Sequence, residues 1–241
     1  MAKKQNQPTR TKLEEFNDSL SGIEQKFEKN KKNIYIIGGC ILAVALLVWG
    51  YFFFIAGPNR TKAAEQVNKG FAQAMLEQND SLALETWSKV AKNYSNDEAN
   101  LARLNAAIVL YKQAEEETDS VKAAKKIDQA IKYIESYDPE GTVIGPASQN
   151  LMANCYVNKG QAYYDKAIEA YDRAIKLSGD NEDYTPYFMF KKAQVLSNLK
   201  TPKFDEAIKV YEEMKQRYPN FADQAQVDKY LERVKAQKGA K

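Results

Sequence analysis

One run of 23 consecutive residues without a charged side chain, residues 34–56, limits the fold more than any other feature. A helix of that length crosses a hydrocarbon core about 30 Å thick, whereas core helices of soluble proteins rarely stay uncharged for so long. Tyr35 at one end, with Trp49 and Tyr51 towards the other, stands where interfacial aromatic anchors are common. The run therefore predicts a transmembrane helix.

The sequence around this run favours an uncleaved signal anchor. A cleaved signal peptide has a shorter apolar core and a shorter segment before it, but here about 33 residues precede the run. Gly57 and Pro58 follow it directly, and both residues disfavour helix interiors. We expect the membrane helix to span residues 34–56 and to end at this pair.

Positive charge near the membrane helix predicts its orientation. Residues 1–32 carry eight Lys or Arg and five Asp or Glu, a surplus of three that equals the net charge of the whole chain. Cytoplasmic flanks are enriched in Lys and Arg, so we expect residues 1–33 in the cytoplasm and residues 59–241 outside it. For a bacterium this means an inner-membrane protein with a periplasmic domain. The opposite topology remains the alternative because the bias is small.

The arm before the membrane helix has an apolar stripe. Its first twelve residues are polar, and apolar residues then recur at spacings of three and four, which is typical of an amphipathic helix. Either this helix lies on the cytoplasmic leaflet or it docks on a membrane partner. The stripe consists of Leu13, Phe16, Leu20, Ile23 and Phe27.

Composition excludes much chemistry. The chain has no histidine, which removes the usual general base and most zinc and haem ligand sets. A net charge of +3 is too balanced to indicate a nucleic-acid partner. Cys40 and Cys155 form no metal or redox motif, and we expect both to be small buried hydrophobes. We expect no enzyme activity, no metal, no cofactor and no small-molecule substrate.

Residues 59–241 read as an all-helical domain with internal repeats. This region is rich in strong helix formers and lacks the alternation of strands. Two segments of it align without a gap at an offset of 40 residues, about 146–179 and 186–219. Small residues recur where helices pack closely, and aromatic residues recur where they fill the space between helices. These expected packing positions are Ala153, Tyr164, Ala167, Tyr171, Ala193, Phe204, Ala207 and Tyr211, with Pro219 after the helix that contains Tyr211.

This spacing resembles the second helix of a tetratricopeptide repeat (TPR), which has an aromatic residue, then alanine, then a second aromatic residue. The resemblance implies a solenoid of helical hairpins. Weaker copies are carried by Ala107 and Ile127 and by Ala83 and Trp87, giving four repeats. We expect residues 223–235 to form a capping helix with a polar outer face.

The whole arrangement is similar to the YfgM-like ancillary subunits of the bacterial Sec translocon. These proteins have a short cytoplasmic arm, one signal anchor and a periplasmic TPR domain. The resemblance implies partners among the translocon subunits, a membrane-anchored periplasmic foldase and emerging client proteins. The residues that carry it, including Ala167, Tyr171 and Pro219, are general packing positions.

TPR solenoids bind peptides on a concave surface formed by the first helix of each pair. Counting along those helices, six residues are expected to face the groove: Asn150, Asn154, Asn158, Tyr187, Gln194 and Asn198. Side-chain amides both donate and accept, so they can pair with the backbone of an extended peptide. The alternative is a solvated helix face without function. We interpret the neighbouring tyrosines, such as Tyr163 and Tyr184, as core residues whose hydroxyls reach water. We interpret the acidic run 115–117 as a solvated loop.

The function expected from these observations is a non-catalytic inner-membrane adaptor. Its periplasmic solenoid would bind proteins as an accessory subunit of the Sec translocon and its foldase. Two alternatives place the same solenoid in another envelope complex or make it a cytosol-facing, membrane-tethered co-chaperone receptor.

Overall fold

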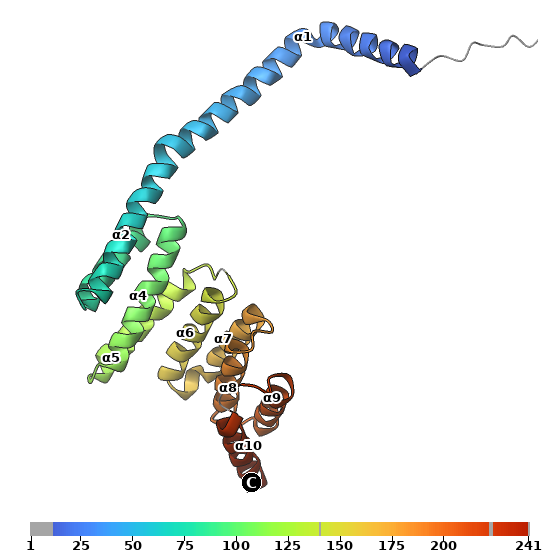
Figure 1. The fold of residues 1–241 in the computed structure, drawn as a ribbon. Coiled ribbons are helices and arrows are strands. Elements are labelled where there is room, and N and C mark those ends of the chain that lie inside the picture. Colours follow the sequence, from blue (N-terminus) through green and yellow to red (C-terminus); the bar gives the residue numbers. More distant parts are fainter. Residues whose placement is uncertain (1–11, 140, 222–223, 241) are drawn as a thin grey trace, which may run out of the picture. The chain divides into compact units, whose positions relative to one another are not determined.

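The computed structural model describes residues 12–139, 141–221 and 224–240 (Figure 1). These residues form helices joined by turns, with no strand among them, which confirms the all-α class. The chain divides into two compact units, Met1–Asn59 and Arg60–Lys241. In chain order the elements are α1 (Lys12–Tyr51), the π-helix η1 (Phe52–Ala56), α2 (Gly57–Met75), α3 (Asp80–Asn93), α4 (Asp97–Glu115), α5 (Ser120–Glu135), α6 (Ile144–Asn158), the 3₁₀-helix η2 (Gln161–Tyr163), α7 (Tyr164–Ser178), α8 (Tyr184–Ser197), α9 (Phe204–Arg217) and α10 (Gln224–Gly239).

The first unit contains the apolar helix. By length and composition this helix could cross a membrane, and none of the described side chains in its apolar stretch is buried in the protein. Leu47, for example, is 74% exposed. On the surface of the helix, the rings of Trp49 and Phe53 stack on each other with 5.3 Å between their centroids. The expected burial of Cys40 is wrong, since its side chain is exposed on α1. The side chains of the apolar stripe, Leu13 to Phe27, lie outside what the structure describes, although their backbone is helical.

The expected helix end at Gly57 and Pro58 is wrong. Helical backbone continues through both residues into α2, and the π-helix η1 stands directly before them. The N–H of Gly57 donates to the carbonyl of Phe52, five residues back, so the turn that precedes the proline is wider than an α-helical turn. Pro58 has no N–H to donate, and its ring clashes with the preceding turn of a regular α-helix. The wider turn explains how the helix passes this residue.

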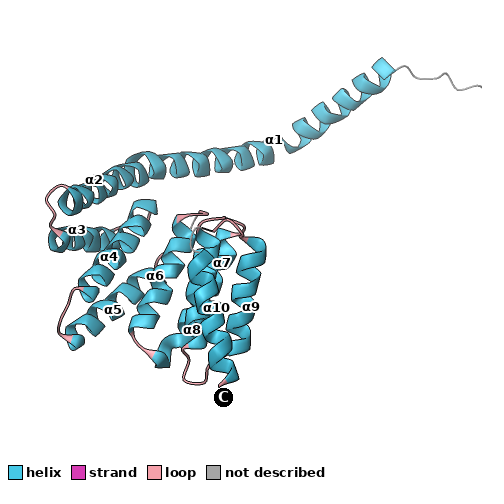
Figure 2. Cartoon of the chain, turned by 60° about the horizontal axis from the view of Figure 1, so that its bottom comes forward, coloured by secondary structure: helices cyan, strands magenta, loops and turns pink. Residues whose placement is uncertain are grey.

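The second unit is an array of antiparallel helical hairpins in chain order (Figure 2). α4 pairs with α5, α6 with α7 and α8 with α9, and each hairpin also packs on the next one along the chain. The expected repeats at 146–179 and 186–219 thus correspond to α6 with α7 and α8 with α9. α9 ends at Arg217, two residues before the exposed Pro219.

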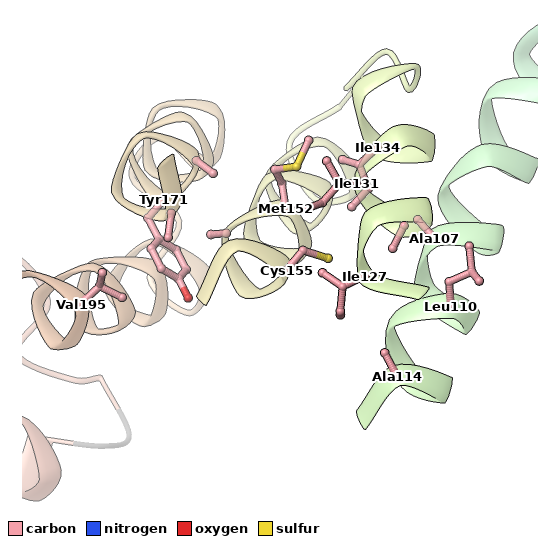
Figure 3. Close-up of a cluster of buried hydrophobic side chains, with 14 residues drawn as sticks. Ala107, Leu110, Ala114, Ile127, Ile131, Ile134, Met152, Cys155, Tyr171 and Val195 are labelled. Carbon is pink, nitrogen blue, oxygen red and sulfur yellow. The ribbon is translucent and has the colours of Figure 1, made fainter. Parts of the chain in front are cut away.

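The alanines that align in sequence let the helices approach closely. Ala153, Ala167, Ala193 and Ala207 are each completely buried. Larger residues fill the remaining space, among them Leu110, Ile127, Met152, Cys155 and Tyr171 in the cluster between α4 and α8 (Figure 3). Tyr164 and Phe204, which open the second helices, are half-buried against the cores. Burial of such clusters is the main favourable contribution to the stability of the array.

α2 and α3 meet at the tightest contact that the structure describes around a glycine. Gly70 on α2 faces the indole of Trp87 on α3, and a methyl group at Gly70 would lie 2.4 Å from the indole Nε1. That Nε1–H donates to the carbonyl of Val67 at 3.2 Å. Phe71 meets the same indole edge to face at 5.3 Å. Glycine is therefore required at this crossing of α2 and α3.

The last helix closes the array. α10 buries Val227, Leu231 and Val234 and leaves a polar outer face, as expected for a capping helix. The helix runs four residues beyond the expected end at Lys235, to Gly239. Residue 223, where the cap was expected to begin, lies outside the described residues.

Candidate functional site

A cleft of about 630 Å³ opens where the first helices of successive hairpins end. Each wall contributes residues spaced three or four apart, so each helix presents one face to the cleft. These residues are Tyr111 and Glu115 on α4, Asn154, Val157 and Asn158 on α6, Tyr187, Lys191, Gln194 and Val195 on α8 with Asn198 directly after it, and Tyr230 and Arg233 on α10, with Tyr164 and Tyr171 of α7 also contributing.

Five of the six expected groove residues line this one cleft: Asn154, Asn158, Tyr187, Gln194 and Asn198. Asn150 does not line the cleft. Its side chain is half-buried, and its buried Oδ1 accepts no hydrogen bond within the described part of the chain. The aligned residue in the next repeat, 40 positions on, is Phe190, which is buried in the core. Asn150 thus turns its Oδ1 toward the core, where this acceptor is deprived of water at a cost.

Two of the amides are held in fixed orientations. The hydroxyl of Tyr171 donates to Oδ1 of Asn154 at 2.8 Å, which leaves the NH₂ of Asn154 as a donor. The NH₂ of Asn198 donates to the backbone carbonyl of Gln194 at 2.7 Å, which leaves Oδ1 of Asn198 as an acceptor. Adjacent walls of the cleft therefore offer one donor and one acceptor, the pair that a peptide group needs.

The tyrosines of this region divide into two groups. Tyr171 is buried, and its hydroxyl bonds Asn154, so the expectation of a wet hydroxyl is wrong for this residue. Burial raises the pKa of Tyr171, so it stays a neutral donor at neutral pH. Tyr184 and Tyr187 are exposed, and Tyr187 turns its ring to the cleft. Tyr163 is half-buried and stacks on Tyr156.

Charged residues lie on the first wall and on the last two walls of the cleft. Glu115 lies at the α4 wall, while Lys191 and Arg233 lie at the α8 and α10 walls. The ammonium of Lys191 is 5.5 Å from the centroid of the Tyr187 ring. Burial raises the pKa of Tyr111 above its usual range, and the hydrogen bond with the Glu115 carboxylate raises it further.

The cleft also contains residues that sequence reasoning missed. Tyr111 and Glu115 repeat the spacing of Asn154 and Asn158, one hairpin earlier. That four-residue spacing could have predicted Tyr111 and Glu115 as cleft residues. The comparison was missed because α4 and α6 do not align at the offset of 40 residues. Arg233 was expected only as one residue of the capping helix 223–235. In the acidic run 115–117, expected to be a solvated loop, Glu115 ends α4 and lines the cleft, whereas residues 116 and 117 lie in the loop, where Glu117 pairs with Lys126 at 3.1 Å.

No candidate metal site is found among the described residues, where no three Cys, Asp or Glu side chains gather suitably. No known family model matches the sequence, and no curated protein matches it. The class of protein that can be stated is therefore structural: an all-helical chain with a long apolar N-terminal helix and an array of packed helical hairpins.

Proposed function

We propose that this protein is a non-catalytic, membrane-anchored adaptor that binds extended segments of other proteins in the cleft between α4 and α10. The observation that carries the proposal is the pair of fixed amides, Asn154 and Asn198, on adjacent walls. A fixed donor and a fixed acceptor recognise backbone, which every client protein has, so the site suits varied sequences. Tyr187 adds an exposed aromatic surface beside them.

The proposed location is the bacterial inner membrane, with residues 1–33 in the cytoplasm and the hairpin array in the periplasm. The length of the apolar helix supports the membrane location. The surplus of positive charge before it supports this orientation. The resemblance to YfgM-like proteins supports an accessory role at the Sec translocon and its periplasmic foldase. The chain would keep its cleft close to proteins that emerge from the membrane.

Co-purification tests the proposal. The tagged full-length protein would be extracted in mild detergent and its bound proteins identified by mass spectrometry, beside a variant without residues 1–56. A cleft variant, Tyr187→Ala with Asn198→Ala, would be compared with a matched surface variant, Lys209→Ala with Lys229→Ala. Both control lysines are exposed and lie outside the cleft.

We expect translocon subunits or a foldase with the wild-type protein and with the surface variant, and a loss of clients with the cleft variant. Retention of every partner by the cleft variant contradicts the proposed site. Recovery of cell-wall enzymes or cytosolic chaperones alone contradicts the translocon assignment, and favours one of the two other scaffold roles.

A further inference from the structure

Two cations of the cleft differ from their neighbours in having no carboxylate partner among the described residues. Lys192, next to Lys191, pairs with Asp172 at 2.6 Å, and Lys235, two residues after Arg233, is 3.5 Å from Glu212. Within the described residues, neither Lys191 nor Arg233 lies within 4 Å of a carboxylate. Both therefore present uncompensated positive charge to the cleft.

The opposite wall carries the opposite charge. Glu115 is exposed at the end of α4, and its carboxylate is hydrogen-bonded to the hydroxyl of Tyr111, which is neutral. No Lys or Arg lies within 4 Å of it in the described part of the chain. The cleft thus holds a negative charge on its first wall and two positive charges on its last walls, with neutral amides between them.

We propose that the preferred occupant of the cleft is an extended protein segment of mixed charge. Its acidic side chains lie against Lys191 and Arg233, its backbone lies on Asn154 and Asn198, and a basic side chain lies against Glu115. This inference rests on the proposed function and narrows it to one class of segment. Complementary charge selects such segments, because a reversed or uniform charge pattern would place like charges together.

The acidic groups that meet Lys191 and Arg233 are assigned to side chains within the bound segment and not to its terminal carboxylate. The negative charge of the cleft lies on its α4 wall and the positive charges lie on its α8 and α10 walls, so an occupant that meets both has to cross it. A chain that crosses the cleft supplies both charges from its side chains, whereas a terminal carboxylate supplies one charge at one end.

Peptide binding to the full-length protein in detergent tests the inference. The probe is a fluorescein-labelled peptide of about twelve residues, blocked at both ends, with two glutamates near one end and two lysines near the other. A second probe replaces the glutamates by glutamines. A third has no acidic side chain and a free terminal carboxylate. Fluorescence anisotropy measures the Kd of each at low and high salt.

We expect the mixed-charge probe to bind about tenfold more tightly than the glutamine probe, and to lose that advantage at high salt. Lys191→Gln with Arg233→Gln weakens binding of the mixed-charge probe about tenfold and leaves the glutamine probe unchanged. The matched control, Lys209→Gln with Lys229→Gln, leaves both unchanged. Far-ultraviolet circular dichroism checks that the variants fold.

Three results overturn the inference: equal binding of the first two probes, no effect of the double substitution, or binding of the third probe alone. They are distinguishable from failure of the proposed function. If partners still co-purify with the wild-type protein and are lost with the Tyr187 and Asn198 variant, the cleft binds proteins without this charge preference.

Discussion

Replacement of Gly70 by alanine provides a sharp test of the packing described here. In an exposed helix this change stabilises by about 1 kcal/mol, because alanine is the better helix former. At Gly70 the added methyl group would lie 2.4 Å from Nε1, 2.7 Å from Cε2 and 2.8 Å from Cδ1 of Trp87. Non-bonded carbon atoms prefer about 3.5–4.0 Å, so the indole has to move by roughly 1 Å.

That movement has a cost, because the Trp87 side chain is only 3% exposed. Overpacking of a core usually costs about 1–3 kcal/mol. Loss of the hydrogen bond to the carbonyl of Val67 adds about 1 kcal/mol. After the gain in helix propensity, we expect Gly70→Ala to lower the free energy of unfolding by about 1–3 kcal/mol.

Urea unfolding of the full-length protein in detergent measures this change, followed by circular dichroism and by Trp87 fluorescence in a Trp49→Phe background. Asn68→Ala is the matched control, because Asn68 is an exposed residue of the same helix. We expect the control to change stability by less than about 0.5 kcal/mol. If Gly70→Ala is as stable as the wild type, the described contact between α2 and α3 is wrong.

Four further predictions concern the second unit. Tyr171→Phe lowers stability by about 1 kcal/mol because its hydroxyl donates a hydrogen bond, whereas Tyr211→Phe is neutral or stabilising because its buried hydroxyl has no described partner; urea unfolding compares them. Burial raises the pKa of both tyrosines above that in the unfolded chain, so their contribution is present below about pH 10 and is lost as pH rises further; unfolding midpoints between pH 8 and 12 measure this. Asn79→Ala removes the acceptor that caps α3 and costs about 1 kcal/mol in the same urea assay. A maleimide labels Cys155 only after unfolding, because burial raises the pKa of its thiol to about 12, and the Cys40→Ser background isolates this signal by mass spectrometry.

Local sequence pattern predicted the packing of the array well. The offset of 40 residues placed Ala153 over Ala193 and Ala167 over Ala207, and all four are completely buried. Small residues at these positions decide how closely two helices approach, so their spacing carries the geometry of the hairpin. The same reasoning failed at Pro58, because its effect depends on the backbone of the preceding turn, and the π-helix there has no sequence signal of its own.

The cleft was only partly predictable. The places of Asn154 and Asn198 in the cleft follow from counting along each residue's own helix. Glu115 and Arg233, in contrast, lie on helices that the repeat does not align. Their meeting depends on how successive hairpins stack, which is a tertiary property. Asn150 was misplaced because its amide suggested an exposed face, although its aligned partner, Phe190, is a core residue.

The central claim is that the cleft between α4 and α10 binds other proteins in the cell. Photocrosslinking tests it most directly, with p-benzoylphenylalanine placed at Tyr187 in the cleft or at Lys209 on the exposed face of α9. The account predicts protein adducts from position 187 that are lost with Asn154→Ala and Asn198→Ala, and few or none from position 209. Equal labelling from both positions, or no adduct from position 187, would contradict it.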